Sequence, residues 1–153
     1  EESFRTPLLM RLPGGKKGDI PQLVQNIDYA PTFLELAGAP IPADIQGESL
    51  LPLLKGERPE NWRNSLYYHY YEYPAEHSVK RHYGVRDDRY KLIPFYNDID
   101  VWELYDLQED PHEMNNLYGK PSYEAVMKRM RDELYKLQKQ YDDPVGIRFN
   151  VSD

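Results

Sequence analysis

The loop Tyr73–Tyr83 carries the side chains best suited to binding chemistry. It places Glu76, His77, Lys80, Arg81 and His82 between two predicted strands. An arginine offers fixed N–H donors that match a sulfate or a carboxylate, and a histidine can hydrogen-bond a sugar hydroxyl. Tyrosines flank these groups, and an aromatic ring suits the apolar face of a pyranose. The loop is therefore our candidate binding site, and a hairpin loop with solvated charges is the competing interpretation.

A second group of potential ligands is acidic. Asp98, Asp100 and Glu103 supply carboxylates of the kind that calcium prefers, but the twelve-residue pattern of a calcium loop is absent. We therefore favour a solvated acidic loop and predict no metal site in this chain. The acids from Asp106 to Glu113 are interpreted as a turn that leads into a helix N-terminus, where negative charge complements the helix dipole.

The remaining sequence offers no catalytic machinery. The chain has no cysteine, which excludes disulfides, thiolate metal sites and a cysteine nucleophile within it. None of its serines lies in a nucleophile elbow, and it has neither a glycine-rich phosphate loop nor an H-E-x-x-H motif. No catalytic residue is therefore predicted in this chain.

Charge and hydropathy exclude two further classes of function. The chain has 153 residues and a formal charge of −7, and seven of its 26 acids lie between Asn97 and Glu113, where there is no lysine or arginine. The neutral remainder offers no broad basic face, so nucleic acid is not an expected partner. No apolar run approaches the ~20 residues of a membrane span. The chain begins at Glu1 with no signal segment, so we expect either a processed N-terminus or part of a longer protein.

The first part of the chain, residues 1–62, is predicted to contain only a few short helices and strands. Pro7–Leu12 is a continuous apolar run before a turn, which favours a strand buried on both faces. Asp28 is a natural N-cap for a helix that ends at Gly38, and Glu48–Gly56 predicts a second, short helix. The first helix is expected to bury its apolar side chains: Phe33, Leu34 and Leu36. A lone strand and helix cannot cover each other, so this region is predicted to be the end of a larger α/β domain.

Residues 63–143 have a different pattern, which predicts strands followed by one long helix. The predicted strands are Leu66–Tyr73, Tyr83–Arg86, Arg89–Ile93 and Trp102–Leu107. Asp87-Asp88 is expected to form a tight hairpin turn with left-handed backbone. Apolar residues from Tyr123 to Tyr141 recur every three or four positions, which indicates the buried stripe of a helix. His69 lies inside the first strand and is interpreted as a structural histidine with satisfied hydrogen bonds.

The predicted fold class is therefore α+β. We expect an antiparallel sheet of about four strands, packed on a long C-terminal helix and preceded by the end of an α/β domain. Residues 144–153 are expected to be a loose tail.

Several segments, taken in order, resemble the formylglycine-dependent sulfatases of the alkaline phosphatase superfamily. The matching segments are Glu1–Gly14 (E-E-S-x-R-x-P-L-x-x-R-x-P-G), Val24–Gly38 (D-x-x-P-T-x-L-x-L-A-G), Gln46–Leu54, Tyr83–Ile93 (R-x-x-x-Y-K-L-I) and Glu103–Glu113 (E-L-Y-D-L-x-x-D-P-x-E). Together they cover residues 1 to about 118. The loop Tyr70–Gly84 is further similar to bacterial N-acetylglucosamine-6-sulfatase-like members.

This resemblance implies the C-terminal part of an enzyme that hydrolyses sulfate esters of sulfated sugars of the glycosaminoglycan type. Such enzymes use a formylglycine and a calcium ion, and both sites would lie upstream of Glu1 in a longer parent enzyme. The resemblance therefore implies a missing N-terminal catalytic domain as partner, no activity for this chain alone, and a periplasmic or secreted parent. In the family, the C-terminal subdomain contacts the sugar, and we assign that role to His77, Arg81 and His82.

Two alternatives remain open from the sequence. The tyrosine-rich sheet and its polar loop are also consistent with a free-standing carbohydrate-binding module. A phosphodiesterase or phosphonate hydrolase of the same superfamily would share the C-terminal architecture.

Overall fold

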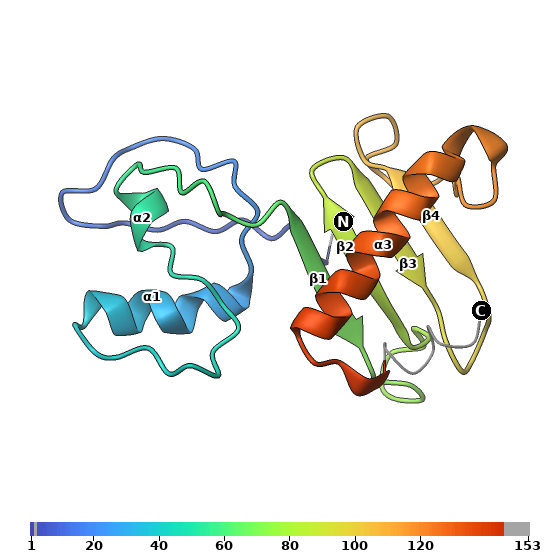
Figure 1. Ribbon diagram of the computed structural model, residues 1–153, viewed down its shortest axis with the longest axis horizontal. Coiled ribbons are helices and arrows are strands. Elements are labelled where there is room, and N and C mark those ends of the chain that lie inside the picture. Colours follow the sequence, from blue (N-terminus) through green and yellow to red (C-terminus); the bar gives the residue numbers. More distant parts are fainter. Residues whose placement is uncertain (2, 146–153) are drawn as a thin grey trace. The chain divides into compact units, whose positions relative to one another are not determined.

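The computed structural model describes Glu1 and residues 3–145, which form two compact units (Figure 1). The sheet unit consists of Glu1 and the chain from Ser65 to Val145, and the helical unit consists of the described residues up to Asn64. Each unit is described separately below.

The sheet unit contains four antiparallel strands in the spatial order of the sequence. The strands are β1 (Ser65–Tyr70), β2 (His82–Asp87), β3 (Tyr90–Pro94) and β4 (Trp102–Asp106). The predicted antiparallel sheet is confirmed, although β1 ends at Tyr70 instead of Tyr73. Tyr70 pairs with His82, where β2 begins, so the residues between them form the connecting loop.

One long helix covers a single face of this sheet (Figure 1). A short 3₁₀ turn, η2 (Pro121–Tyr123), leads into helix α3 (Glu124–Gln140), as the apolar spacing predicts. The core between helix and sheet consists of Tyr83, Val85, Leu92, Tyr96, Leu104, Met130, Leu134 and Leu137. Since side chains alternate along a strand, the neighbours of Val85 and Leu92 point away from α3. The sheet therefore has an apolar face under α3 and a second face that carries polar and aromatic groups.

The hairpin turn between β2 and β3 is held by a side chain instead of left-handed backbone. The carboxylate of Asp87 accepts hydrogen bonds from the backbone N–H groups of Arg89 at 2.8 Å and Tyr90 at 2.6 Å. Among the described non-glycine residues, positive φ occurs at Asn97, Glu113 and Asp142, and so not in this turn. The expected left-handed turn is wrong because the Asp87 oxygen supplies the acceptor that closes it.

The acidic segment after β4 does not lead into a helix, contrary to expectation. Glu113 has left-handed backbone, with φ of 56°, and the next helical turn begins only at Pro121. Left-handed backbone at a non-glycine residue interrupts helical geometry. Asp106 instead accepts hydrogen bonds from Gln108 N at 3.2 Å and Glu109 N at 3.4 Å, which closes a turn.

Three of the seven acids between Asn97 and Glu113 are paired with bases from other segments. Three ion pairs join an acid of residues 97–113 to an arginine or lysine side chain at least 17 positions away: Arg81–Asp98, Arg89–Asp106 and Lys91–Glu113. The expected solvated acidic loop is therefore wrong at Asp98, because its carboxylate pairs with Arg81. The fold therefore offsets part of the local acid surplus.

Acid should weaken the sheet unit through these pairs. Hydrogen bonds from Arg89 hold the pKa of Asp106 below its ordinary value of 3.8. A carboxyl whose folded pKa is depressed stabilises the fold above its unfolded pKa, and this stability is lost as pH falls through the folded pKa. We expect Asp106→Asn to be less stable than the native chain at neutral pH and to show a flatter loss of unfolding free energy below about pH 4.

Urea unfolding at several pH values measures this difference. The matched control is Asp132→Asn, which removes an exposed acid of α3 that pairs only with Lys128 four residues away. Equal acid slopes for Asp106→Asn and the native chain would contradict the expectation.

The helical unit is organised around one buried carboxylate. Its elements are η1 (Asn26–Asp28), α1 (Tyr29–Leu36) and α2 (Leu51–Leu54). Asp28 precedes α1 as predicted, but its side chain does not cap the helix. Its oxygens instead accept hydrogen bonds from Gln25 N at 2.7 Å and Glu48 N at 2.8 Å, and they form a two-pronged pair with Arg63 at 2.6 and 2.7 Å.

A second set of contacts fixes the segment before α2 against the start of α1. Thr32 Oγ1 donates to Asp28 O at 2.6 Å and accepts from Leu50 N at 2.8 Å. A Cβ built on Gly47 would lie 2.1 Å from the carbonyl oxygen of Ile27, so only glycine permits this close approach. Hydrogen bonding and packing thus account for the presence of Asp28, Thr32 and Gly47 in the motifs of this unit.

Two expectations for the helical unit are wrong. Pro7–Leu12 forms no strand, because the described part of the unit contains no other strand with which it can pair. The second helix is limited to Leu51–Leu54, although Gly56 ends it with left-handed backbone as predicted, at φ of 80°.

The outward face of α1 is apolar. Phe33 is 61% exposed and Leu36 is 45% exposed, whereas Pro31 and Thr32 are buried. The expected inward packing of Phe33 and Leu36 is therefore absent within this unit, and Leu34 is only half-buried.

The predicted loose tail, residues 144–153, is described only in part. Val145 packs against the core of the sheet unit. Residues 146–153 lie outside the described residues.

Candidate substrate-binding site

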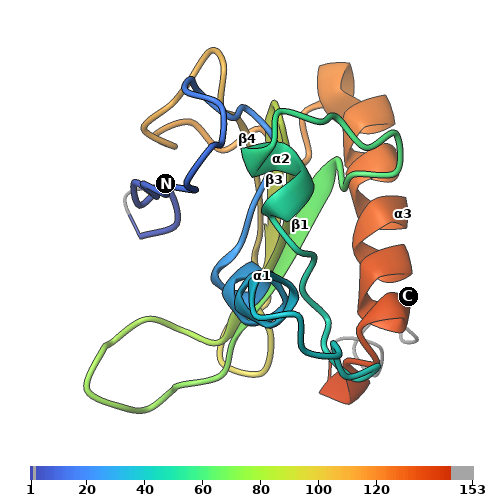
Figure 2. The same cartoon turned by 90° about the vertical axis from the view of Figure 1, so that its left-hand side faces the viewer.

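The candidate loop, residues 71–81, joins β1 to β2 and extends beyond the end of the sheet (Figure 2). Its base is the pair Tyr70–His82, and an isolated bridge between His82 and Phe95 continues the sheet beside it. Most of its side chains from Tyr71 to Val79 are exposed. The loop thus places a polar edge at one end of an otherwise well-packed sheet.

Arg81 lies at the base of the loop and is held by Asp98. Its Nε donates to Asp98 Oδ2 at 3.0 Å and its Nη2 donates to Asp98 Oδ1 at 2.9 Å. These hydrogen bonds raise the pKa of Arg81 and lower the pKa of Asp98, so both groups stay charged near neutral pH. The Arg81 side chain is still 30% exposed, and Nη1 has no hydrogen-bond partner among the described residues. The guanidinium is therefore pre-oriented and keeps donors for an anionic ligand.

His82 is held in one tautomer beside Arg81. Its Nδ1 lies 2.8 Å from the carbonyl oxygen of Lys80, and because a carbonyl only accepts, Nδ1 carries the proton. Burial lowers the pKa of His82, which keeps the ring neutral at pH 7. The ring stacks on Tyr70 at 5.3 Å between centroids. Neutral His82 therefore offers Nε2 as an acceptor, which suits a sugar hydroxyl better than a sulfate.

His77 and Lys80 lie apart from this pair. His77 is exposed in the loop, and no contact with Arg81 or His82 is found among the described residues. Lys80 donates to the hydroxyl of Tyr73 and lies 3.6 Å from the centroid of that ring. The structure therefore places Arg81 and His82, which are neighbours in the sequence, at the base of the loop with separate side-chain partners, and it leaves His77 on the outer part of the loop.

The predicted structural histidine is confirmed, and its partners were not predicted. His69 Nδ1 lies 2.5 Å from Asp143 Oδ2, and its Nε2 lies 2.6 Å from Tyr96 Oη. Asp143 is 74 residues from His69 in the sequence. No local spacing signals such a contact, so only the fold reveals it.

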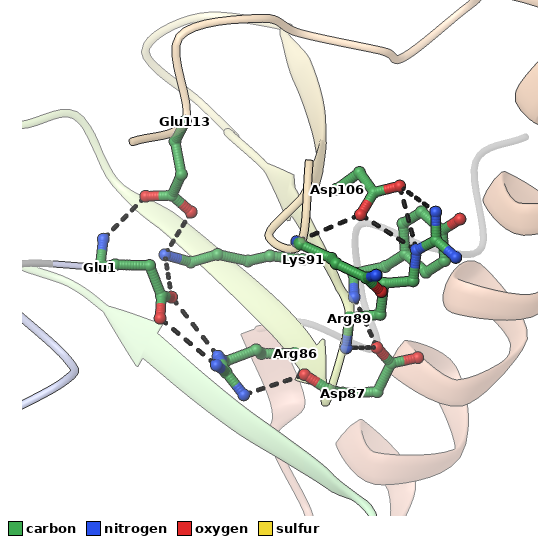
Figure 3. Close-up of polar contacts among 9 residues, drawn as sticks. Glu1, Arg86, Asp87, Arg89, Lys91, Asp106 and Glu113 are labelled. Atoms are coloured by element: carbon green, nitrogen blue, oxygen red, sulfur yellow. Dashed lines mark hydrogen bonds and ion pairs between the residues drawn. The ribbon is translucent and has the colours of Figure 1, made fainter. Parts of the chain in front are cut away.

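A second charged cluster lies on the face of the sheet away from α3 (Figure 3). Lys91 Nζ pairs with Glu113 Oε1 at 2.7 Å and with Glu1 Oε1 at 3.2 Å, and Arg86 lies 3.4 Å from the Glu1 carboxylate. Although burial opposes it, the charges of Arg86 and Lys91 lower the pKa of Glu1. The N-terminal ammonium of Glu1 also lies 2.8 Å from Glu113 Oε2, so the acids and bases of this cluster pair with one another and thereby stabilise the sheet.

The described residues offer no place for a metal ion. Residues 3–145 with Glu1 contain no group of three or more His, Asp or Glu side chains that could hold one. Asp98, the first acid of the possible calcium loop, is engaged by Arg81. Within the same residues, no helix has the length and apolar character needed to cross a membrane.

Comparison with known proteins identifies the family. The model for the C-terminal region of N-sulphoglucosamine sulphohydrolase matches residues 1–140. An N-acetylglucosamine-6-O-sulfatase of Bacteroides thetaiotaomicron is 54% identical over 147 residues, which is 94% of this chain and 26% of that protein. A multifunctional alkaline phosphatase superfamily protein of Trinickia caryophylli is 34% identical over 83% of this chain and 27% of its own length.

Solved structures agree with this assignment. One, in complex with its substrate D-glucosamine-2-N,6-O-disulfate, is 57% identical with a TM-score of 0.74, over 76% of this chain and 24% of that chain. A phosphonate monoester hydrolase from Silicibacter pomeroyi is 28% identical with a TM-score of 0.73, over 86% of this chain and 28% of that chain. The chain spans about a quarter of the length of the curated relatives that it matches. The chain belongs to the family of sulfatase C-terminal regions described as N-sulphoglucosamine sulphohydrolase, C-terminal.

Proposed function

We propose that the parent enzyme hydrolyses sulfate esters of sulfated sugars and that this chain supplies one wall of its substrate pocket. The observation that carries this proposal is the 54% identity to an N-acetylglucosamine-6-O-sulfatase over 94% of the chain. A similar solved structure holds a disulfated glucosamine as its substrate, which matches the chemistry of the loop. Charged Arg81 suits an anionic group of such a sugar, and neutral His82 suits a hydroxyl.

The catalytic groups of the parent would lie outside this chain. The resemblance implies calcium and formylglycine, but the described residues hold no cluster that fits a metal ion, and the chain has no cysteine. We therefore assign no catalytic step to these residues, and we expect the chain alone to hydrolyse nothing. Its role in the parent is to bind and orient the sugar.

We also propose that residues 1–62 are the end of the parent's α/β catalytic domain. The exposed apolar side chains of the helical unit support this assignment, since a monomeric soluble protein rarely exposes a large apolar patch. Phe33 and Leu9, which is 95% exposed, would then be covered by that domain. We also propose a periplasmic or secreted location for the parent, as the resemblance to sulfatases implies.

Alanine substitutions in the full-length enzyme test the pocket assignment. Arg81→Ala should lower kcat/KM on the sulfated sugar by about tenfold or more, because it removes a charge-assisted hydrogen bond. His82→Ala and His77→Ala should each lower it by more than about threefold. The matched control is Arg129→Ala, which removes an exposed arginine of α3 that pairs with Asp87.

Steady-state kinetics on glucosamine-2-N,6-O-disulfate supply the readout. A change of less than about threefold for Arg81→Ala and His82→Ala would remove both residues from the pocket. If His77→Ala alone leaves kcat/KM unchanged, the pocket is restricted to the base of the loop.

A phosphonate monoester hydrolase is the second candidate, favoured by the 28% identical structure from Silicibacter pomeroyi. The 54% identical sulfatase makes it the weaker candidate. The full-length enzyme should therefore turn over a sulfate ester with a higher kcat/KM than a phosphonate monoester, and the opposite ranking would favour the second candidate.

A further inference from the structure

We propose that His69 is a positioning residue that fixes both ends of the loop 71–81, with Asp143 and Tyr96 orienting its ring. This inference rests on the proposed function, because Arg81 and His82 lie at one end of that loop. It assigns a role in substrate binding to three buried residues that do not contact the substrate.

The three side chains form one continuous hydrogen-bonded chain across the sheet unit. Asp143 follows α3, His69 lies in β1 and Tyr96 follows β3. The His69 and Asp143 side chains are 3% and 6% exposed, so water does not compete for these contacts. These hydrogen bonds therefore connect the residues after α3, through β1, to the segment after β3 that flanks the loop.

The direction of each hydrogen bond follows from the chemistry of the groups. Burial raises the pKa of Tyr96 to about 12, so its hydroxyl remains protonated and donates to His69 Nε2. His69 Nδ1 then carries the proton that is donated to the Asp143 carboxylate. Asp143 also accepts from the Tyr67 hydroxyl and from Val145 N at 3.0 Å. Three donors hold the carboxylate in place, and the carboxylate in turn fixes the tautomer and orientation of His69.

His69 contacts the first residue of the loop. The ring of Tyr71 stacks on His69 with 3.9 Å between centroids and 23° between planes. Tyr71 is largely exposed on its other side. The His69 ring therefore holds Tyr71, the residue that directly follows β1, in place.

Tyr96 connects His69 to the last residue of the loop. Its backbone N–H donates to Arg81 O at 3.2 Å, and its carbonyl accepts from Asp98 N at 2.7 Å. Asp98 is the residue that orients the Arg81 guanidinium. A shift of Tyr96 would thus move both the backbone and the side-chain partner of Arg81.

The geometry of this network matters more than its net stabilisation, although removing a single partner is also expected to lower Tm, because the other groups are left unsatisfied. A buried ionic or polar chain is often no more stabilising than apolar side chains of the same volume, because desolvation offsets its attraction. Its hydrogen bonds nevertheless have one allowed geometry, which apolar contacts do not impose. The expected consequence of disturbing it is a misplaced loop on a folded sheet.

The test uses Tyr96→Phe and Asp143→Asn in the full-length enzyme, with glucosamine-2-N,6-O-disulfate as substrate. Each variant should raise KM by about 5–30-fold, the size expected for one buried hydrogen bond, while kcat changes less than about twofold. Hydrogen exchange should accelerate in peptides that cover residues 71–81 and stay unchanged over α3. In a double variant with Arg81→Ala the effects should be less than additive, because both act through the same contact.

Matched controls separate positioning from general damage. Tyr118→Phe removes a hydroxyl that accepts from Arg131 at 2.7 Å, outside the loop, and Asp132→Asn removes an exposed carboxylate. Neither control should change KM or exchange in the loop.

Two results would overturn the inference: an unchanged KM with unchanged loop exchange, or exchange that accelerates as much across α3 as in the loop. If Arg81→Ala and His82→Ala are silent, the proposed function fails instead, and loop exchange still tests the positioning. If those two variants raise KM while Tyr96→Phe does not, only the positioning role fails.

Discussion

Replacing Asp28 with alanine is expected to lower the free energy of unfolding of the helical unit by about 3–5 kcal/mol. Asp28 is fully buried and Arg63, its partner, is 11% exposed at the side chain. The substitution leaves the guanidinium without its partner and removes the acceptor of Gln25 N and Glu48 N. Losing one partner of a buried pair costs far more than the pair contributes over an apolar replacement, because the remaining charge stays desolvated.

Hydrogen exchange in the helical unit measures this effect. Amides of α1 and of the segment around Glu48 should exchange at least about 100-fold faster in Asp28→Ala. Gly47→Ala should act in the same direction, since its Cβ would meet Ile27 O at 2.1 Å. Asp44→Ala, which removes an exposed aspartate of the same unit, is the control and should change little. Similar exchange in Asp28→Ala and Asp44→Ala would show that Asp28 does not organise the unit.

Replacing Lys91 with methionine is expected to destabilise the sheet unit by a similar amount, about 3–5 kcal/mol. The Lys91 side chain is 3% exposed and lies between the carboxylates of Glu1 and Glu113. Methionine keeps the length of the side chain but removes the cation between the two carboxylates, which retain Arg86 and the N-terminal ammonium of Glu1 as partners. Like charges that have lost their counter-ion repel each other in a partly buried site.

Urea unfolding followed by the tyrosine and tryptophan signals measures this loss. Lys91→Met combined with Glu113→Gln should recover much of the stability, because the second change removes the uncompensated charge. Lys128→Met breaks an exposed pair of α3 in which Lys128 is 77% exposed, and it should cost no more than about 1 kcal/mol. A loss for Lys91→Met no larger than for Lys128→Met would contradict the role assigned to the cluster.

The parts of the fold that follow from local pattern could be predicted from the sequence. The apolar period from Tyr123 to Tyr141 predicts α3, and the alternating strands predict the sheet, because each element must bury one face. The strand predicted at Pro7–Leu12 is wrong because a strand needs a neighbour with which to pair. The sequence pattern alone does not show whether the chain contains such a neighbour. The left-handed turn at Asp87-Asp88 fails because a carboxylate can close a turn in place of the backbone.

The site could be predicted only as a loop, and its internal contacts could not. Residue types identified Arg81 and His82, but Asp98 pairs with Arg81 from 17 positions away. Tyr96 and Asp143 contact His69 from 27 and 74 positions away. Contacts at such separations depend on how strands and helix assemble, and no periodicity encodes them. The same applies to Asp28, whose position suggests a cap while its partners lie 20 and 35 residues away.

The ion cluster around Lys91 also governs how members of this family can be recombined. Glu1 belongs to the sheet unit, whereas the residues that follow it up to Asn64 belong to the helical unit. The sheet unit is thus a discontinuous domain, and the apparent boundary before Ser65 separates Glu1 from Arg86 and Lys91. A chimera that joins two relatives at that point inherits a compatible cluster only if both carry an acid at the position of Glu1. Exchanging the sheet unit between relatives therefore requires that first residue to travel with it.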